Sequence, residues 1–190
     1  MRIENRLQLQ LWREECKEKH QKEKCRILVC GGTGCLAGGS DKIYARFKEM
    51  SEGMDHVTVK IGEEIAHPGV KMSGCHGFCE MGPLVRIEPY NYLYLKVKLE
   101  DCEEIFEKTI LRGEPVERLM YHDDHKVYET QEEIPFYAEQ TRLVLKNCGH
   151  IDAEHIEEAI AAGAYEEGGK GGKGREEGKE GEEGGKGKEE

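Results

Sequence analysis

The 190-residue sequence has few aromatic residues, 7% of the chain, and a single tryptophan. No apolar run approaches the roughly 20 residues of a transmembrane helix, and residues 1–20 have no apolar segment of the signal-peptide kind. A basic excess is also missing, since 28 Lys and Arg face 39 Asp and Glu, for a formal net charge of −11. Nucleic acid is therefore not an expected partner, because binding to its backbone depends on clustered positive charge. We expect a soluble, cytoplasmic protein without a transmembrane segment.

The chain does contain eight cysteines. Disulfides are rare in a reducing compartment, so the cysteines of a cytoplasmic protein call for another explanation. The length allows one domain comfortably and two small ones at most. The question is therefore which part of the chain folds and where its cysteines lie.

Residues 25–121 carry the hydrophobic pattern of a small core. The pattern predicts strands at 25–30, 56–61, 84–87 and 92–97, a helix of about ten residues capped by Ser40, and a second helix over 99–111. The last two strands flank a short Pro-containing turn and are expected to form a hairpin. The predicted fold class is α/β (α+β): a four-stranded mixed sheet with flanking helices, of which the thioredoxin-like fold is one arrangement.

Three further segments surround this core. Residues 1–24 form a polar, helix-prone stretch with Leu7 and Leu11 on one face and Trp12 and Cys16 near it. This face is expected to pack on the next domain or on a partner. Residues 122–165 read as a linker up to residue 133 followed by a helical extension, with one helix from Pro135 to about residue 147 and another capped by Asp152. Residues 166–190 contain only Gly, Lys, Arg and Glu and are expected to be a disordered tail.

Four of the cysteines form two closely spaced pairs. Cys30 and Cys35 have four residues between them, and Cys75 and Cys79 have three. Both pairs follow predicted strands, and glycines at 31, 32, 34, 74 and 77 surround them. Glycine lets backbone amides approach a small anionic cluster where a Cβ would obstruct them. The two segments are therefore expected to lie in loops that bring four thiolates together.

Three kinds of chemistry compete for these thiols. A structural zinc ion also takes four thiolates, and the spacing of four and three is tolerable for it. A redox-active disulfide prefers two intervening residues, which neither pair has. An iron–sulfur cluster fits two pairs from two loops, and [2Fe–2S] is more natural than [4Fe–4S] because each iron can take one pair.

The motifs around the pairs resemble a known family. Residues 27–35 (ILVCGGTGC) and 74–83 (GCHGFCEMGP) look like the thioredoxin-like [2Fe–2S] ferredoxin domain, over about residues 1–121. That domain occurs as a subunit of respiratory complex I and ahead of the flavin subunit in NADP-reducing and electron-bifurcating hydrogenases. The resemblance implies a thioredoxin-like fold and a [2Fe–2S] cluster with Cys30, Cys35, Cys75 and Cys79 as ligands.

A second resemblance covers residues 134–165. The stretches IPFY, QTR, VLKNCGHID and AAGAY are similar to the opening of the NADH-binding flavoprotein subunit of complex I and its hydrogenase relatives. The family's Gly-rich FMN and NADH site and its [4Fe–4S] motif do not follow in this sequence. FMN and NAD(P) are thus expected only in a partner or a missing domain. The resemblance implies a shortened relative or fragment that carries electrons, is not catalytic alone, and partners flavoprotein or hydrogenase subunits.

The remaining candidates receive structural interpretations. Cys102 lies on the apolar face of a predicted helix and is expected to be a buried thiol. His76 stands between two ligand candidates and is expected to tune the cluster by its charge, since a histidine pKa lies near neutrality. The others are expected not to bind metal: Cys16 and Cys25 as free thiols, Cys148 as structural, and His122, Asp123, Asp124 and His125 in a solvated linker. A cluster in this acidic protein should have a negative potential, toward the roughly −400 mV of plant-type ferredoxins.

Overall fold

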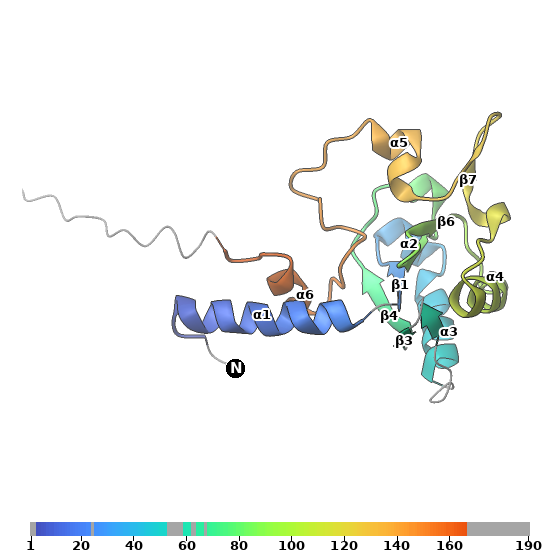
Figure 1. The fold of residues 1–190 in the computed structure, drawn as a ribbon. Helices are drawn as coiled ribbons and strands as arrows, with labels where there is room; N and C mark the ends of the chain where they lie inside the picture. The colour runs from blue at the N-terminus through green and yellow to red at the C-terminus, as the bar shows by residue number, and fades with distance from the viewer. Residues whose placement is uncertain (1–2, 24, 53–58, 62–63, 67, 167–190) are drawn as a thin grey trace, which may run out of the picture.

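In the computed structural model, the described residues are 3–23, 25–52, 59–61, 64–66 and 68–166 (Figure 1). The expected tail beyond Glu166 and the beginning of the strand expected at 56–61 lie outside them. No helix among the described residues combines the length and the apolar character that crossing a bilayer would require.

The centre of the fold is a four-stranded mixed sheet, as the sequence predicts. Its strands are β4 (Pro68–Ser73), β1 (Cys25–Cys30), β5 (Val85–Glu88) and β6 (Tyr92–Tyr94), in that spatial order. β4 runs parallel to β1, and β5 and β6 form the expected antiparallel hairpin. Five of the six β1 residues are buried, because β1 has neighbours on both edges and helices against the sheet.

One strand of this sheet differs from the prediction. Within its described residues, the segment expected as a strand at 56–61 forms β2 (Val59–Ile61), which pairs with β3 (Glu64–Ala66) in a separate two-stranded sheet. The fourth strand of the central sheet is β4 instead, which pairs with β1. β4 begins with Pro68 and Gly69 and is only half-buried along its middle. These residues weaken the alternating pattern by which strands are found in a sequence.

Two helices complete the main core. α3 (Ser40–Glu52) buries Ile43 and Phe47, and α4 (Asp101–Ile105) continues into a π-helical turn, η2 (Phe106–Ile110). The inward positions expected for the second helix are confirmed; they are Cys102, Ile105, Phe106, Thr109 and Ile110. Ser40 is not the expected cap, because it lies within α3 and its buried hydroxyl makes no hydrogen bond.

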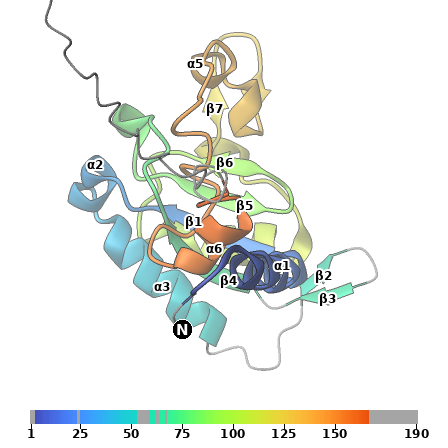
Figure 2. The same ribbon diagram turned by 90° about the vertical axis from the view of Figure 1, so that its left-hand side faces the viewer.

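An arm of two helices lies beside β4. α1 (Arg6–Lys22) packs antiparallel to α6 (Ile156–Ala161), and Figure 2 looks along α1 with α6 beside it. Of the residues expected on or near the packing face, Leu7 and Leu11 remain 65% and 54% exposed, whereas Cys16 is buried. The buried face also carries Arg13, whose guanidinium donates to the carbonyls of Ile160 and Ala164. This face of α1 packs on α6 because the carbonyls at the C-terminal end of α6 have no donor within their own helix, and Arg13 supplies one.

The chain between the core and α6 is folded, not a plain linker. After η3 (Glu117–Leu119) comes a small hairpin of β7 (Tyr121–His122) and β8 (Val127–Tyr128), followed by η4 (Gln131–Glu133). The helix expected from Pro135 to about residue 147 ends early, as α5 (Pro135–Ala138). Residues 143–145 beyond it are exposed, so no buried face sustains a longer helix. Asp152 does not cap α6, because its backbone pairs with Ser73 and α6 begins only at Ile156.

Candidate metal centre

One end of the central sheet gathers the two cysteine pairs. β1 ends at Cys30, and the parallel strand β4 ends at Ser73, so the loop carrying Cys75 leaves the sheet at the same edge. Cys35 lies in a short helix, α2 (Thr33–Ala37), and Cys79 begins a 3₁₀ turn, η1 (Cys79–Met81). The prediction that both pairs lie in loops holds for Cys75, whereas Cys30 is the last residue of β1 and Cys35 and Cys79 lie in short helical turns. The short turns tighten the chain so that all four side chains face one region.

The sulfur atoms lie around two glycines. The sulfurs of Cys75 and Cys79 are 3.7 Å apart. A Cβ placed on Gly32 would lie 2.9 Å from the Cys75 sulfur and 3.5 Å from the Cys30 sulfur. A Cβ on Gly82 would lie 2.6 Å from the Cys35 sulfur. Both glycines leave room that the thiols occupy, so a side chain at either position would displace a sulfur.

The glycines predicted to surround the thiols divide into two groups. Gly32 and Gly34 lie against the paired cysteines and the Gly77 amide approaches Cys75, whereas Gly31 faces Met72 and Gly74 faces Cys148. Gly82 has the closest approach to a thiol and was not predicted to have a role. Its only sequence signal is the pair Gly82-Pro83 shortly after Cys79.

Burial separates the four thiols into an inner and an outer pair. Cys30 and Cys35 are buried, while Cys75 and Cys79 are exposed. A group held by all four would therefore have one side within the protein and the other at the surface. The exposed side would bring such a group close to a partner that exchanges electrons with it. Solvent exposure is also one of the factors that set the reduction potential of a redox centre.

Hydrogen bonds favour the thiolate form of Cys30, one of the inner pair. The pKa of Cys30 falls to about 6 because the Cys35 thiol and the backbone amides of His76 and Gly32 hydrogen-bond its sulfur, against the effect of burial. The pKa of Cys35 is correspondingly raised, first by its bond to Cys30 and then by burial. At Cys75, the amide of Gly77 approaches the sulfur at 3.4 Å. The predicted contact between backbone amides and sulfur is therefore present at both pairs.

His76 does not have the environment expected from the sequence. Its side chain is fully buried, and burial, followed by the charge of Arg86, lowers its pKa to about 3. Burial therefore disfavours the charged form of His76, which argues against the expected tuning by its charge. Its Nε2 lies 2.8 Å from the Ser73 hydroxyl, and its Nδ1 has no hydrogen-bond partner.

Aromatic rings surround the residue between the outer thiols. Phe78 stacks on Phe136 with ring centroids 4.4 Å apart and planes within 9°. Tyr137 meets the same ring edge-on, and Tyr121 is tilted against it. Aromatic pairs of this kind contribute roughly 0.5–1.5 kcal/mol beyond their buried area. These rings attach the segment after β8 to the cysteine loop, a contact that the sequence did not indicate.

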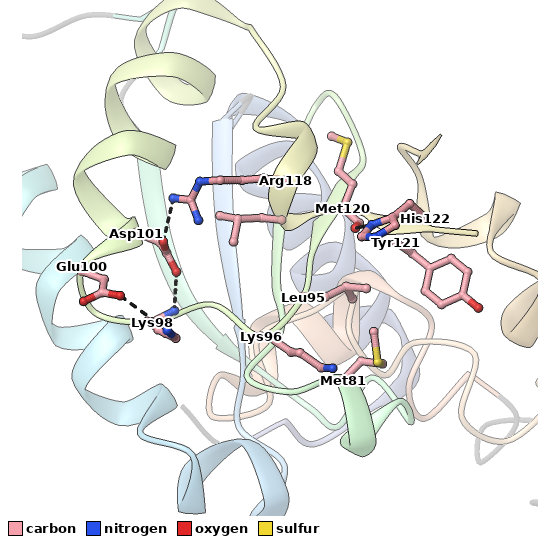
Figure 3. A pocket seen from close by; sticks show the side chains of 11 residues that line it. Met81, Leu95, Lys96, Lys98, Glu100, Asp101, Arg118, Met120, Tyr121 and His122 are labelled. Atoms are coloured by element: carbon pink, nitrogen blue, oxygen red, sulfur yellow. Dashed lines mark hydrogen bonds and ion pairs between the residues drawn. The ribbon is translucent and has the colours of Figure 1, made fainter. Parts of the chain in front are cut away.

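A cavity of about 430 Å³ adjoins this end of the molecule (Figure 3). Met81 lines it two residues after Cys79, and the amide of Lys96 donates to the Met81 carbonyl at 2.8 Å. Most of its charges are paired within the chain, as Asp101 accepts from Arg118 at 2.7 Å and Lys98 lies 3.6 Å from Glu100. None of the eight cysteines lines the cavity, so it is a neighbour of the thiol site and not part of it.

The other four cysteines lie away from the two pairs. The expectation of a buried Cys102 is confirmed, and burial raises the pKa of Cys102 and of Cys25 to about 12. Cys16 is buried against α6, and Cys148 is half-buried beside Gly74. All eight cysteines are free thiols, and no disulfide links them.

The donor set fits an iron–sulfur group. Four thiols from two segments meet at glycine-lined positions, and amide hydrogens point at the sulfurs of Cys30 and Cys75. Within the part of the chain that the structure describes, no three His, Cys, Asp or Glu side chains are grouped closely enough to hold one metal ion. A binuclear cluster does not require such a group, because its four ligands are divided between two irons.

Comparison with known proteins adds independent findings. The family described as "Thioredoxin-like [2Fe-2S] ferredoxin" matches residues 17–109. A "Ferredoxin, 2Fe-2S" of Aquifex aeolicus is 50% identical over 86 residues, 45% of this chain and 71% of that protein. A "Ferredoxin, 2Fe-2S" of Clostridium pasteurianum is 32% identical over 98 residues, 50% of this chain and 94% of that protein. A solved thioredoxin-like [2Fe–2S] ferredoxin of Aquifex aeolicus matches with a TM-score of 0.43 and 30% identity, over 51% of this chain and 89% of that one.

Proposed function

Because the chain belongs to the thioredoxin-like [2Fe–2S] ferredoxin family, we propose that Cys30, Cys35, Cys75 and Cys79 are the ligands of its cluster. The family assigns the chain a [2Fe–2S] cluster and the role of an electron carrier. The observation that carries the ligand assignment is the meeting of the four thiols at one end of the sheet.

When bound, the cluster supplies a one-electron couple. The chain holds it through two thiolates from the buried side and two from the surface. The amides that point at Cys30 and Cys75 stabilise negative charge on these sulfurs without any proton transfer. The protein therefore needs no general acid or base, and its outer pair, Cys75 and Cys79, marks the face on which a redox partner would dock.

We further propose that the carrier works in a cytoplasmic NAD(P)H-dependent oxidoreductase or hydrogenase complex. The support is the resemblance of residues 134–165 to the opening of a flavoprotein subunit. On this proposal, residues 25–121 are the ferredoxin domain, residues 1–24 and 122–165 flank it, and the flavin belongs to a partner or missing domain. Co-purification of an FMN-containing subunit with the full chain tests this context, and isolation without any flavoprotein from its native host would count against it.

The visible spectrum of protein purified without oxygen tests the cluster itself. A brown protein that bleaches on addition of dithionite, with two irons and two sulfides per chain, is expected. The alternative, a structural zinc ion on the same four thiols, predicts a colourless protein with stoichiometric zinc. A colourless zinc protein would overturn the proposed function.

Serine substitutions test the ligand assignment. Cys75→Ser removes a proposed ligand, so most of the cluster absorbance and iron should be lost. Cys102→Ser is the matched control, because its thiol is fully buried in the helical core and should affect folding stability and not cluster content. Equal iron loss in the two variants, measured on folded protein by circular dichroism and iron analysis, would show that the ligand assignment is wrong.

A further inference from the structure

Residues 136–153, termed the strap here, run antiparallel to the loop that carries Cys75. At one end the backbone of Asp152 pairs with Ser73, and the amide of Ala153 donates to the Met72 carbonyl at 3.1 Å. Figures 1 and 2 show this part of the chain returning from α5 past the end of β4 toward α6. The strap lies outside residues 17–109, the part that matches the family.

The contacts continue along the loop in reverse order. Cys148 lies beside Gly74, with its sulfur 3.6 Å from the point where a Cβ of Gly74 would sit. Further on, a guanidinium nitrogen of Arg142 lies 4.0 Å from the corresponding point on Gly77. At the far end, Phe136 stacks on Phe78 at 4.4 Å. The strap therefore touches the loop on both sides of Cys75.

The tightest contact is between Gly149 and His76. A Cβ on Gly149 would lie 2.8 Å from Nδ1 of His76 and 3.0 Å from its Cγ, and Gly149 has a φ of +86°, which L side chains rarely adopt. On its other side the His76 ring meets the Ser73 hydroxyl at 2.8 Å. The ring is thus held between the end of β4 and the strap backbone. The backbone amide of His76 hydrogen-bonds the sulfur of Cys30, so movement of the ring would change the geometry of this hydrogen bond.

We propose that the strap is a positioning element for the cluster loop, and that Gly149 and His76 are its positioning residues. The strap holds residues 73–78 in the conformation that aims Cys75 and the His76 amide at the cluster, and it keeps water from that side of the loop. This inference rests on the proposed function, in which Cys75 and Cys79 are ligands. Opening the strap should speed cluster loss and shift the reduction potential, because loop hydration and amide geometry both act on the potential.

Two glycine variants of the full chain test the proposal. Gly149→Ala introduces a Cβ against the His76 ring, whereas Gly163→Ala has a similar φ of +99° but meets nothing closer than a Glu166 carboxylate oxygen at 3.4 Å. Both carry comparable backbone strain, and only Gly149→Ala should release iron to a chelator about 10-fold faster, as for lost outer-shell partners. Gly149→Ala should also shift the midpoint potential and the visible circular dichroism. Equal release rates and equal potentials in the two variants would overturn the proposal.

A second pair of variants covers the case in which Gly149→Ala does not fold. Phe136→Ala removes the ring that stacks on Phe78 from a side chain that is 41% exposed, and Val144→Ala shortens a strap side chain that is 94% exposed. Phe136→Ala should release iron several-fold faster than wild type, and Val144→Ala at the wild-type rate. Identical rates in the two would contradict the proposal. Because Cys75→Ser tests ligation alone, its loss of iron would still support the proposed function if the strap variants had no effect.

Discussion

At Gly82 the backbone itself makes room for a thiol. The residue has a φ of −76°, which alanine adopts without strain, so backbone conformation does not require glycine there. A Cβ would, however, lie 2.6 Å from the Cys35 sulfur and 3.3 Å from the Cys79 carbonyl oxygen. Glycine is needed at this position for space near two of the proposed ligands.

This close approach leads to a prediction for Gly82→Ala. The added methyl group should push Cys35 out of position and weaken cluster binding about 10-fold, while the fold persists because the backbone angles suit alanine. Iron and sulfide content and thermal unfolding followed by far-ultraviolet circular dichroism would measure the two effects. Gly69→Ala on β4 is the control, since its Cβ would meet nothing closer than 3.8 Å. Equal iron content in the two variants would contradict the steric argument.

At the residue scale, the sequence revealed the thiols but not their surroundings. The four cysteines could be singled out because spacing and neighbouring glycines are local properties of the chain. The state of His76 could not be predicted, because Gly149, which packs against its ring, lies far along the chain, and the charge of Arg86 is brought near it only by the folded sheet. The pKa of a side chain depends on its surroundings in the folded protein, and a short sequence motif does not specify those surroundings.

At the scale of elements, the start of α4 depends on one buried carboxylate. Asp101 accepts a hydrogen bond from the Lys98 amide at 2.8 Å and pairs with Arg118 at 2.7 Å, and it is nearly inaccessible to solvent. It therefore connects the turn after β6 to η3. Its neighbour Glu100 is exposed and has only a 3.6 Å pair with the exposed Lys98.

Alanine substitutions at these two adjacent positions should differ in effect. Asp101→Ala should lower the free energy of unfolding by about 2 kcal/mol, because it removes a cap-like hydrogen bond and leaves Arg118 with Glu104 alone. Glu100→Ala should change it by less than about 0.5 kcal/mol, as for exposed pairs. Urea unfolding of both variants would measure the difference. Similar values would show that Asp101 has no special structural role.

The elements that the sequence predicted well are those with a strong hydrophobic pattern. β1 and the β5–β6 hairpin are short, almost continuously buried runs, and the inward positions of α4 and η2 recur at the period of a helix. β4 was missed because Pro68, Gly69 and Lys71 interrupt that pattern, although the pairing with β1 spans its whole length. The sequence of the strap has no hydrophobic periodicity. Its conformation depends on contacts with the cysteine loop and not on a helix or strand propensity of its own.

At the scale of the whole molecule, buried charges join the arm to the sheet. Lys71 on β4 pairs with Glu158 on α6 and with Glu23 after α1. Burial alone would raise the pKa of Glu158, but its bonds to Lys71 and to the Asp152 amide outweigh this and lower it. His20 on α1 faces Glu158 at 3.9 Å, and burial, followed by Arg26, lowers its pKa.

Both shifts give the arm the same dependence on pH. A lowered folded-state pKa adds stability above the unfolded value, and this stability is lost as pH falls through the folded-state pKa. The attachment of the arm should therefore weaken below the usual His20 pKa of 6.5 and further below the usual Glu158 value of 4.5. Glu158→Gln should remove the lower part of this dependence and cost about 2 kcal/mol near neutrality, less than a fully broken buried pair because Glu23 remains.

Trp12 offers a direct measurement of this effect. It is the only tryptophan of the chain, and it lines a groove with Ile160 and Tyr165 between the two helices. Its emission maximum should move to longer wavelength as pH falls and the arm opens, before the sheet unfolds. A wavelength that stays constant until the far-ultraviolet circular dichroism of the whole protein changes would show that the arm does not open separately.

The antiparallel pairing of α1 with α6 also determines how the molecule would respond to force. Ile3, before α1, and Tyr165, after α6, line the same groove. Tension applied between them would therefore separate the two helices starting from the N-terminal end of α1 and the C-terminal end of α6. The carbonyl contacts of Arg13 would carry the load before it reached Lys71 and then β4. Such a geometry peels contacts one after another and yields at low force. The force would reach the sheet edge with the four thiols only after α1 and α6 had separated.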